Sequence, residues 1–164
     1  MSNCPRIALL GAAMLVLAAC GGAPSTPDFV HKVAMADRYE IAAGKIANEK
    51  GRSDAVKQYG RHMIEAHSQT SDELTSIVAA EKLDVAMPGR LSKRYHSMIE
   101  ALNGAPPEDF DKIYAKQQIK VHKRAEELFD AYAEGGNNAA LKQFAANVLP
   151  TVKQHLEQAE KLVP

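Results

Sequence analysis

The sequence predicts an all-α protein: an antiparallel four-helix bundle with a short extra helix in the connection between the second and third long helices. Apolar residues recur three and four positions apart over long segments, which is the spacing of one helix face. No run of β-branched residues alternates with polar ones, as a half-buried strand requires. Clusters of Gly, Pro, Ser and Asn separate the periodic segments and set the helix boundaries.

The first two long helices are predicted to pair across a short connection. The first begins near Pro27, with Thr26 as its N-cap, and ends by Gly51. The second starts at Ser53, a favourable N-cap, and runs to about Glu81. Their apolar faces consist of Phe29, Val33, Ala36, Ala43 and Ala47 in the first helix and of Val56, Met63, Leu74 and Ile77 in the second.

A long connection and a second helix pair follow. Met87-Pro88-Gly89 interrupts the chain, a short helix ends at Asn103-Gly104, and the third long helix opens at Pro106-Pro107. Gly135-Gly136 stops that helix, and Pro150 removes one backbone hydrogen bond from the fourth, which we expect to kink there. A single long connection between two helix pairs is a known arrangement of four-helix bundles.

The N-terminal segment has the pattern of an export signal. Arg6 precedes an apolar run that starts at Ile7 and ends in Leu17-Ala18-Ala19-Cys20. The run is shorter than the roughly 20 apolar residues that a membrane-spanning helix needs. Its last four residues resemble the bacterial lipobox, which implies cleavage before Cys20 and acylation of that cysteine with fatty acids such as palmitate.

These boundaries divide the chain into a signal peptide (1–19), an acylated cysteine with a flexible linker (20–27) and a bundle domain (28–164). Several acyl chains hold a protein stably in a bilayer, so we expect attachment to the membrane through Cys20. Gly21 follows the cysteine where Asp would direct retention in the inner membrane. By resemblance to enterobacterial sorting, this predicts the outer membrane of a bacterial cell envelope, with the bundle facing the periplasm.

The composition excludes several classes of function. The chain has 20 basic and 20 acidic residues without a basic cluster, so we expect no nucleic-acid partner. Its two cysteines, Cys4 and Cys20, fall in the signal and at the lipid site, which excludes thiolate catalysis in the bundle domain. No Gly-x-Ser-x-Gly elbow occurs, so a hydrolase is poorly supported. The sequence favours a protein that is not an enzyme.

Polar residues interrupt the apolar face of every long helix. Glu40 lies on the inner face of the first helix, His67 on that of the second, Gln118 and His122 on that of the third, and His155 on that of the fourth. Burying such groups costs free energy unless they are paired or bind a metal. Imidazole and carboxylate are common metal ligands, so Glu40, His67, His122 and His155 are candidates to hold one transition-metal ion, zinc or iron.

An alternative without a metal stays open, in which these residues are hydrogen-bonded members of the core. Buried polar groups usually find hydrogen-bond partners, and a Glu40–His pair would need no metal. If both short connections lie at one end of the bundle, the four candidates spread over roughly 10 Å along its axis, so that only a subset could share an ion. Asp111 and Tyr114 could form a polar pair near the start of the third long helix, or Asp111 could simply be a first-turn acid. Three further histidines are predicted to be surface or rim residues: His31, His62 and His96.

Several short pieces of the chain form a recognisable order and spacing: Ala36 to Ile41, Met63 to His67, Phe110-Asp111, Tyr114, His122, Leu149-Pro150 and His155. In these pieces the chain resembles a bacterial family of predicted outer membrane proteins, domain of unknown function 4142. The resemblance implies a ferritin-like bundle in the cell envelope and no established activity. Tyr114, Gln118 and Asp111 are candidates to hold the ligands in place. Ferritin-like relatives bind two metals through Glu and Glu-x-x-His pairs, which this sequence lacks, so we expect one metal or none.

Two functions therefore compete. The first is an envelope-anchored lipoprotein whose bundle binds a protein partner or has a structural or stress-related role. The second is a metal-binding ferritin-like bundle with a His/Glu site in its core.

Overall fold

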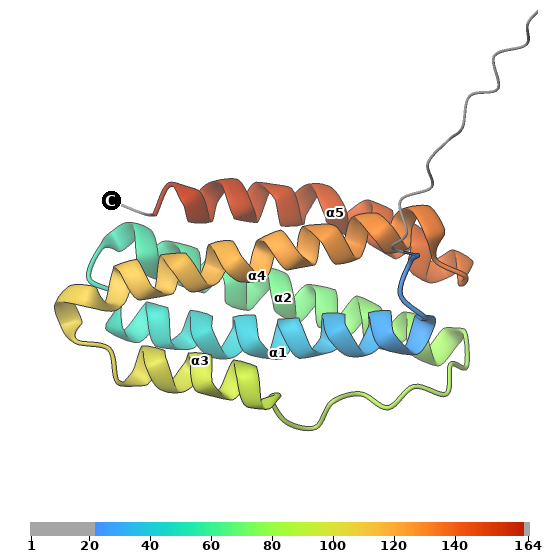
Figure 1. The fold of residues 1–164 in the computed structure, drawn as a ribbon, viewed down its shortest axis with the longest axis horizontal. Coiled ribbons are helices and arrows are strands. Elements are labelled where there is room, and N and C mark those ends of the chain that lie inside the picture. Colours follow the sequence, from blue (N-terminus) through green and yellow to red (C-terminus); the bar gives the residue numbers. More distant parts are fainter. Residues whose placement is uncertain (1–21, 163–164) are drawn as a thin grey trace, which may run out of the picture.

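The structure is a computed structural model that describes residues 22–162, so the predicted signal peptide and Cys20 lie outside the described residues. These residues form helices and no strand, which confirms the all-α bundle and its short extra helix (Figure 1). None of these helices combines the length and apolar character needed to cross a bilayer. The helices are α1 (Thr26–Lys50), α2 (Asp54–Ala80), α3 (Lys93–Asn103), α4 (Pro107–Gly135) and α5 (Ala139–Glu160).

The two short connections lie at opposite ends of the bundle (Figure 1). The α4–α5 connection lies beside the start of α1, where the Thr26 and Tyr132 hydroxyls are 2.6 Å apart. At the other end, the α1–α2 connection lies beside the start of α4, because Asp111 accepts hydrogen bonds from the backbone N–H groups of Arg52 and Ser53, each at 2.9 Å. Helices α2 and α4 therefore run in the same direction, opposite to α1 and α5. The premise that both connections share one end was wrong.

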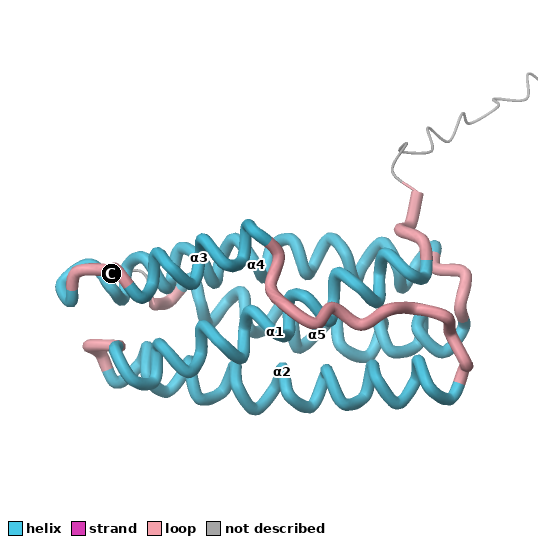
Figure 2. Tube along the Cα trace, turned by 90° about the horizontal axis from the view of Figure 1, so that it is seen from below, coloured by secondary structure: helices cyan, strands magenta, loops and turns pink. Residues whose placement is uncertain are grey.

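A long crossing segment makes this topology possible. Figure 2 shows the chain running back along the bundle from the end of α2 to the start of α3. Met35 receives the backbone N–H of Ser92 on its sulfur at 3.2 Å, which ties the start of α3 to α1. The rings of Tyr39 and Tyr95 then stack with centroids 4.7 Å apart. A short helix thus returns the chain to the end at which α4 must begin.

Side-chain caps define most helix starts. Ser53, Ser92 and Asn138 cap α2, α3 and α5. The predicted cap of α1 was wrong by one residue, since Ser25 accepts from the backbone N–H of Asp28 at 3.4 Å. Thr26 is the first residue of the helix, and its hydroxyl instead forms hydrogen bonds with Tyr132 and Asn137 at the α4–α5 end of the bundle. Helix α5 is a single helix that continues through Pro150.

The interior consists of two apolar clusters with a polar layer between them. One cluster includes Phe29, Phe129 and Phe144 near the α4–α5 connection. The other includes Tyr59 and Tyr114 toward the α1–α2 connection. Five polar side chains are buried in addition to these clusters: Asp37, Glu40, Gln118, His122 and His155.

Helices α1 and α2 approach most closely at two glycines. A Cβ atom on Gly44 would lie 2.6 Å from the Gly60 carbonyl oxygen, and one on Gly60 would lie 2.8 Å from that of Gly44. Both distances are shorter than a Cβ can tolerate against a backbone atom, so any side chain would push the helices apart. This close approach holds α2 against α1 beside the polar layer.

We expect Gly60→Ala to lower the free energy of unfolding by about 1–3 kcal/mol, because the helices must separate to admit the methyl group. The sign is informative, since Gly→Ala inside a helix otherwise stabilises by roughly 1 kcal/mol. Urea denaturation followed by circular dichroism measures the change. Gly89→Ala is the control, because a Cβ there would meet no atom within 4 Å. A Gly60→Ala protein as stable as the wild type would contradict the close approach.

Candidate metal centre

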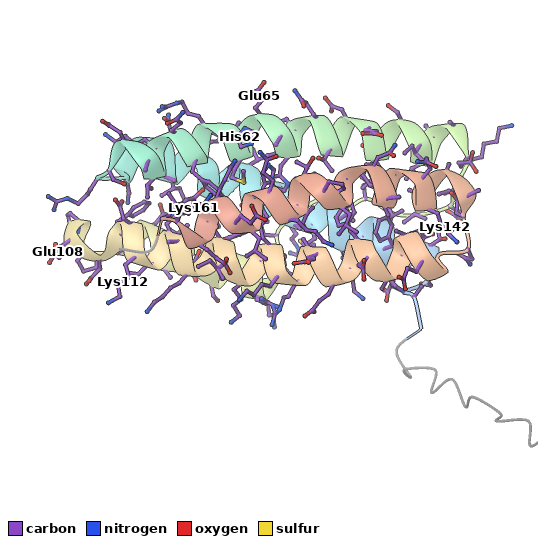
Figure 3. The ribbon with its side chains drawn as sticks, turned by 90° about the horizontal axis from the view of Figure 1, so that it is seen from above. His62, Glu65, Glu108, Lys112, Lys142 and Lys161 are labelled. Carbon is purple, nitrogen blue, oxygen red and sulfur yellow. The ribbon has the colours of Figure 1, made fainter. Side chains whose placement is uncertain are left out.

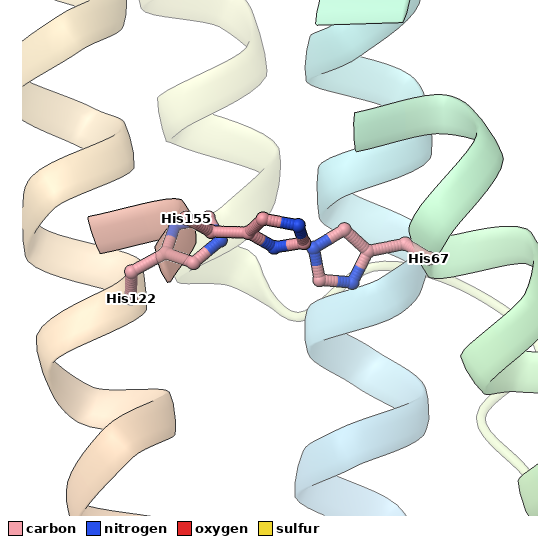
Figure 4. Close-up of side chains that lie close together, drawn as sticks. All are labelled: His67, His122 and His155. Atoms are coloured by element: carbon pink, nitrogen blue, oxygen red, sulfur yellow. The ribbon is translucent and has the colours of Figure 1, made fainter. Parts of the chain in front are cut away.

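Three histidines from three helices meet in the polar layer (Figure 4). His67 comes from α2, His122 from α4 and His155 from α5, and each offers one ligand nitrogen within 4.8 Å of the other two. Their ring centroids are 5.8 Å apart for His67 and His122, 5.8 Å for His67 and His155, and 5.4 Å for His122 and His155. The axial spread predicted for these histidines is absent, because it assumed that both short connections lie at one end. Glu40, the fourth candidate, is not in this group, so a subset of the candidates meets, as expected.

The topology explains this convergence. Helices α2 and α4 start at the same end, and His67 and His122 each lie about four turns into their helix. Helix α5 begins at the far end and runs back, so that His155 reaches the same level from the opposite direction. The Tyr59 hydroxyl donates to the His155 carbonyl oxygen at 3.1 Å and fixes α5 against α2 at this point.

The His67 ring is held by a buried carboxylate. Its Nδ1 lies 2.8 Å from Oδ1 of Asp37, whose side chain is 3% exposed. A carboxylate only accepts, so Nδ1 donates the hydrogen bond to Asp37, and in the neutral form of the ring the lone pair lies on Nε2. Within residues 22–162, that Nε2 has no hydrogen-bond partner.

The His122 ring is held by the backbone. Its Nδ1 lies 3.0 Å from the carbonyl oxygen of Gln118, one helical turn earlier. Because a carbonyl oxygen can only accept, Nδ1 carries the proton and Nε2 keeps its lone pair. This Nε2 is buried and meets no hydrogen-bond partner in the described part of the chain.

The His155 ring is held by a fourth histidine. Its Nε2 lies 3.2 Å from Nε2 of His62, which is exposed on α2. When His155 donates this hydrogen bond, its Nδ1 keeps the lone pair. That Nδ1 is buried and has no partner among the residues that the structure describes. All three rings therefore have one nitrogen engaged and the other free.

Two of the three rings are neutral at physiological pH. Burial, together with the positive charge of His67, lowers the pKa of His122 to about 3. Burial and the charges of the neighbouring histidines lower the pKa of His155 to about 3. Since only a deprotonated imidazole nitrogen can bind a metal, both rings are ready to do so without losing a proton.

Carboxyl groups surround His67. Burial disfavours its charged form, but the hydrogen bond and negative charge of Asp37, and then the charge of Glu40, outweigh burial and raise the pKa of His67. Burial raises the pKa of Asp37 although His67 opposes it. Burial also raises the pKa of Glu40 to about 7, again against the charge of His67. The carboxyl groups of Asp37 and Glu40 therefore favour a positive charge at His67, whether a proton or a metal ion carries it.

Glu40 is buried in the polar layer but does not belong to the group of three. Neither of its carboxylate oxygens has a hydrogen-bond partner within the described ranges. The same holds for the Gln118 amide and the Tyr114 hydroxyl.

The predicted pair of Tyr114 with Asp111 does not form, because Asp111 binds the α1–α2 connection. Its role is at the end of the bundle rather than beside the ligands.

Sequence reasoning missed two residues of this layer. Asp37 lies four positions after Val33 and three before Glu40, so its place on the inner face could have been found from helical spacing. His62 was predicted to be a rim residue, and it is exposed, as are His31 and His96. Its contact with His155 depends on how α2 and α5 pack, for which the sequence has no signal.

A large cavity reaches the histidines from one side. Its volume is about 700 Å³, and His67, His155 and Asp37 line it together with apolar residues of α1, α4 and α5. A water molecule occupies only roughly 30 Å³ of liquid volume, so solvent has ample room to reach the rings. The centre is therefore buried in the bundle without being sealed.

Comparisons with known proteins agree with this fold. Residues 13–162 match the family described as Domain of unknown function (DUF4142). No curated protein matches the chain. A solved structure described as "CopM in the Cu(II)-bound form" is similar, with a TM-score of 0.71 and 14% sequence identity over 85% of this chain and 95% of that chain. At this identity the similarity shows a shared helical fold.

Proposed function

The chain belongs to the DUF4142 family, and we propose that it binds one transition-metal ion through His67, His122 and His155 at the centre of its bundle. The ligand nitrogens would be Nε2 of His67, Nε2 of His122 and Nδ1 of His155. The proposal is a binding function. It does not assign a reaction.

The observation that carries this proposal is the pairing of the six ring nitrogens. In each ring one nitrogen contacts a holding group: Asp37, the Gln118 carbonyl or His62. The other nitrogen is buried without a partner within residues 22–162, and the three rings face one another. An unsatisfied buried polar atom costs about 1–3 kcal/mol, and three of them in one place are costly unless an ion binds them. Metal-bound histidines almost always donate their second nitrogen in this way.

The geometry suits an ion with three nitrogen ligands and an open position. Metal–nitrogen bonds of about 2.0–2.1 Å place ligand atoms roughly 3.3 Å apart around a tetrahedral ion. The ligand nitrogens lie within 4.8 Å of one another, so the rings need to approach by at most about 1.5 Å. Asp37 and Glu40 are buried nearby and supply negative charge against the ion. Exposure of the centre to the cavity leaves room for water or another ligand in the open position.

Copper(II) is the ion that we favour. Among divalent first-row metals, affinity for nitrogen ligands is greatest for copper(II), with zinc(II) below it. CopM, whose fold is similar, is described in a Cu(II)-bound form, which supports the choice of ion. The alternative is a bundle with a binding or structural role in the envelope and no metal. It does not explain why three buried histidine nitrogens lack a hydrogen-bond partner within residues 22–162.

We further propose that the bundle works at the bacterial cell envelope, tethered by lipids on Cys20. The support is the sequence Leu17-Ala18-Ala19-Cys20 and the linker that follows it. This location would place the metal site in the periplasm, where a thiol-free ligand set is insensitive to oxidation.

The test is metal analysis of a protein that begins at residue 20, purified without chelator and then titrated with copper(II) and zinc(II). We expect about one ion per chain. His67→Ala should weaken binding by at least 100-fold, since it removes a ligand where loss of a supporting group alone costs 10–100-fold. Isothermal titration calorimetry measures both constants.

His96→Ala is the matched control, because His96 is exposed on α3 and outside the group of three. It should bind as the wild type does. A wild-type protein that takes up neither metal, or equal effects of the two substitutions, would refute the proposed function.

A further inference from the structure

His62 stands apart from the other exposed histidines because it contacts the candidate metal centre. It is exposed on the side of α2 that faces α5 (Figure 3). Its Nε2 lies 3.2 Å from Nε2 of the buried His155, with ring centroids 5.0 Å apart. A separate groove of about 390 Å³ surrounds it, lined by residues that include Tyr59, Gln158 and Lys161. One histidine pair therefore connects the solvent to the centre.

We propose that His62 and His155 form an outer metal site, through which the ion reaches His67, His122 and His155. The inference rests on the proposed metal binding and adds to it a route and a second pair of ligands. It identifies the ligand as the same hydrated divalent transition-metal ion.

The spacing of the pair suits two ligands of one ion. Two imidazole nitrogens bound to the same tetrahedral ion lie roughly 3.3 Å apart when the metal–nitrogen bonds are about 2.0–2.1 Å. The two Nε2 atoms are already 3.2 Å apart. Because His62 is exposed, water can complete the coordination of an ion at this position. The pair can therefore bind an ion without moving either helix.

His155 belongs to both sites, and its chemistry allows transfer between them. A neutral imidazole has one proton and one lone pair, so the ring binds an ion through one nitrogen at a time. An ion in the outer site uses the Nε2 lone pair and leaves the proton on Nδ1. When the ion moves inward to Nδ1, the ring loses the Nδ1 proton and regains one on Nε2, so that it stays neutral and Nε2 donates a hydrogen bond to His62. Three imidazoles then replace two, which favours the inner position.

The large cavity is the competing route, and charge does not exclude it. Lys32, Arg94 and Arg124 line it together with Asp28, Asp37 and Glu127, and Lys161 lines the groove at His62. The feature that favours the outer site is its pair of imidazole nitrogens, 3.2 Å apart. His31 is also exposed at this cavity and offers an imidazole there. The same substitution at His31 and at His62 therefore distinguishes the two routes.

The experiment measures rates as well as affinity. A glutamine at position 62 can accept the hydrogen bond from His155 but is a poor metal ligand. In stopped-flow absorbance with copper(II), we expect His62→Gln to slow uptake and release each by about 10-fold, which leaves their ratio, the Kd, within about 3-fold of the wild type. A residue that only orients His155 through this hydrogen bond would leave both the uptake rate and the Kd unaltered in His62→Gln.

His31→Gln is the matched control and should leave both rates unchanged. An unchanged uptake rate in His62→Gln would overturn the outer site, as would slower uptake in His31→Gln alone. Failure of the wild type to bind copper(II) at all would reject the proposed function instead, so the two failures are distinguishable.

Discussion

Replacing His122 with leucine is expected to abolish metal binding and to stabilise the metal-free bundle. Leucine is close to histidine in size, and it removes a buried Nε2 that has no partner within the described residues. The gain should be about 1–3 kcal/mol at pH 7, the usual cost of such a group. The backbone carbonyl of Gln118 still accepts the helical hydrogen bond, so no new orphan arises.

Metal addition should reverse the order of stability of these two proteins. A ligand that binds only the folded state stabilises it by about 4 kcal/mol at 1,000 times its Kd. The wild type should therefore become more stable than His122→Leu in saturating copper(II), and less stable than it in chelator. Urea denaturation in both conditions measures this inversion. His96→Leu, at an exposed site, should show no such inversion. A His122→Leu protein that is less stable in chelator, or still responds to copper(II), would rule out this reading of the site.

The second large effect is the dependence of stability on pH, which Glu40→Gln should change. Burial raises the pKa of Glu40 from an ordinary value of 4.5 to about 7 in the folded protein. Between these values the folded state holds more protons than the unfolded state, so the contribution of Glu40 is present below pH 4.5 and is lost as the pH rises through 7. Glutamine mimics the protonated form and loses nothing. The variant should therefore match the wild type near pH 4.5 and exceed it by about 3 kcal/mol at pH 8.

A comparison variant makes this measurement specific. Asp111→Asn should have the opposite sign, because backbone hydrogen bonds from Arg52 and Ser53 outweigh burial and lower the pKa of Asp111. Its contribution is present at neutral pH and is lost as the pH falls through the folded pKa. Chemical denaturation in chelator from pH 8 to below 3.8, the ordinary pKa of Asp111, gives both profiles. A Glu40→Gln protein with the same pH profile as the wild type would show that Glu40 is solvated.

These two expectations have one physical origin. A polar layer interrupts two apolar clusters, and its members are better suited to an ion than to one another. Proteins often retain such destabilising groups where function requires them. The metal-free bundle is thus expected to be less stable than its size allows, and metal binding is expected to restore the difference.

Much of the fold could be predicted because helical spacing and capping are local properties. The boundaries of α2 and α4 follow from Ser53 and from Pro107, and the inner faces follow from residues three and four positions apart. The same spacing put His67, His122 and His155 on inner faces. The predicted N-cap of α1 was wrong by one residue, because Ser25 and Thr26 are adjacent and either type of residue can cap a helix. Asp37 could have been included on the same grounds as Glu40.

The sequence by itself determined that four long helices would form, that each would turn a polar group inward, and that a long segment would separate the two pairs. Only the tertiary structure decided that the two short connections lie at opposite ends, and hence that His155 returns to the level of His67 and His122. It alone paired His67 with Asp37 and His155 with His62. The reason is physical: periodicity fixes which face of a helix is buried, whereas direction and axial register depend on how whole helices pack.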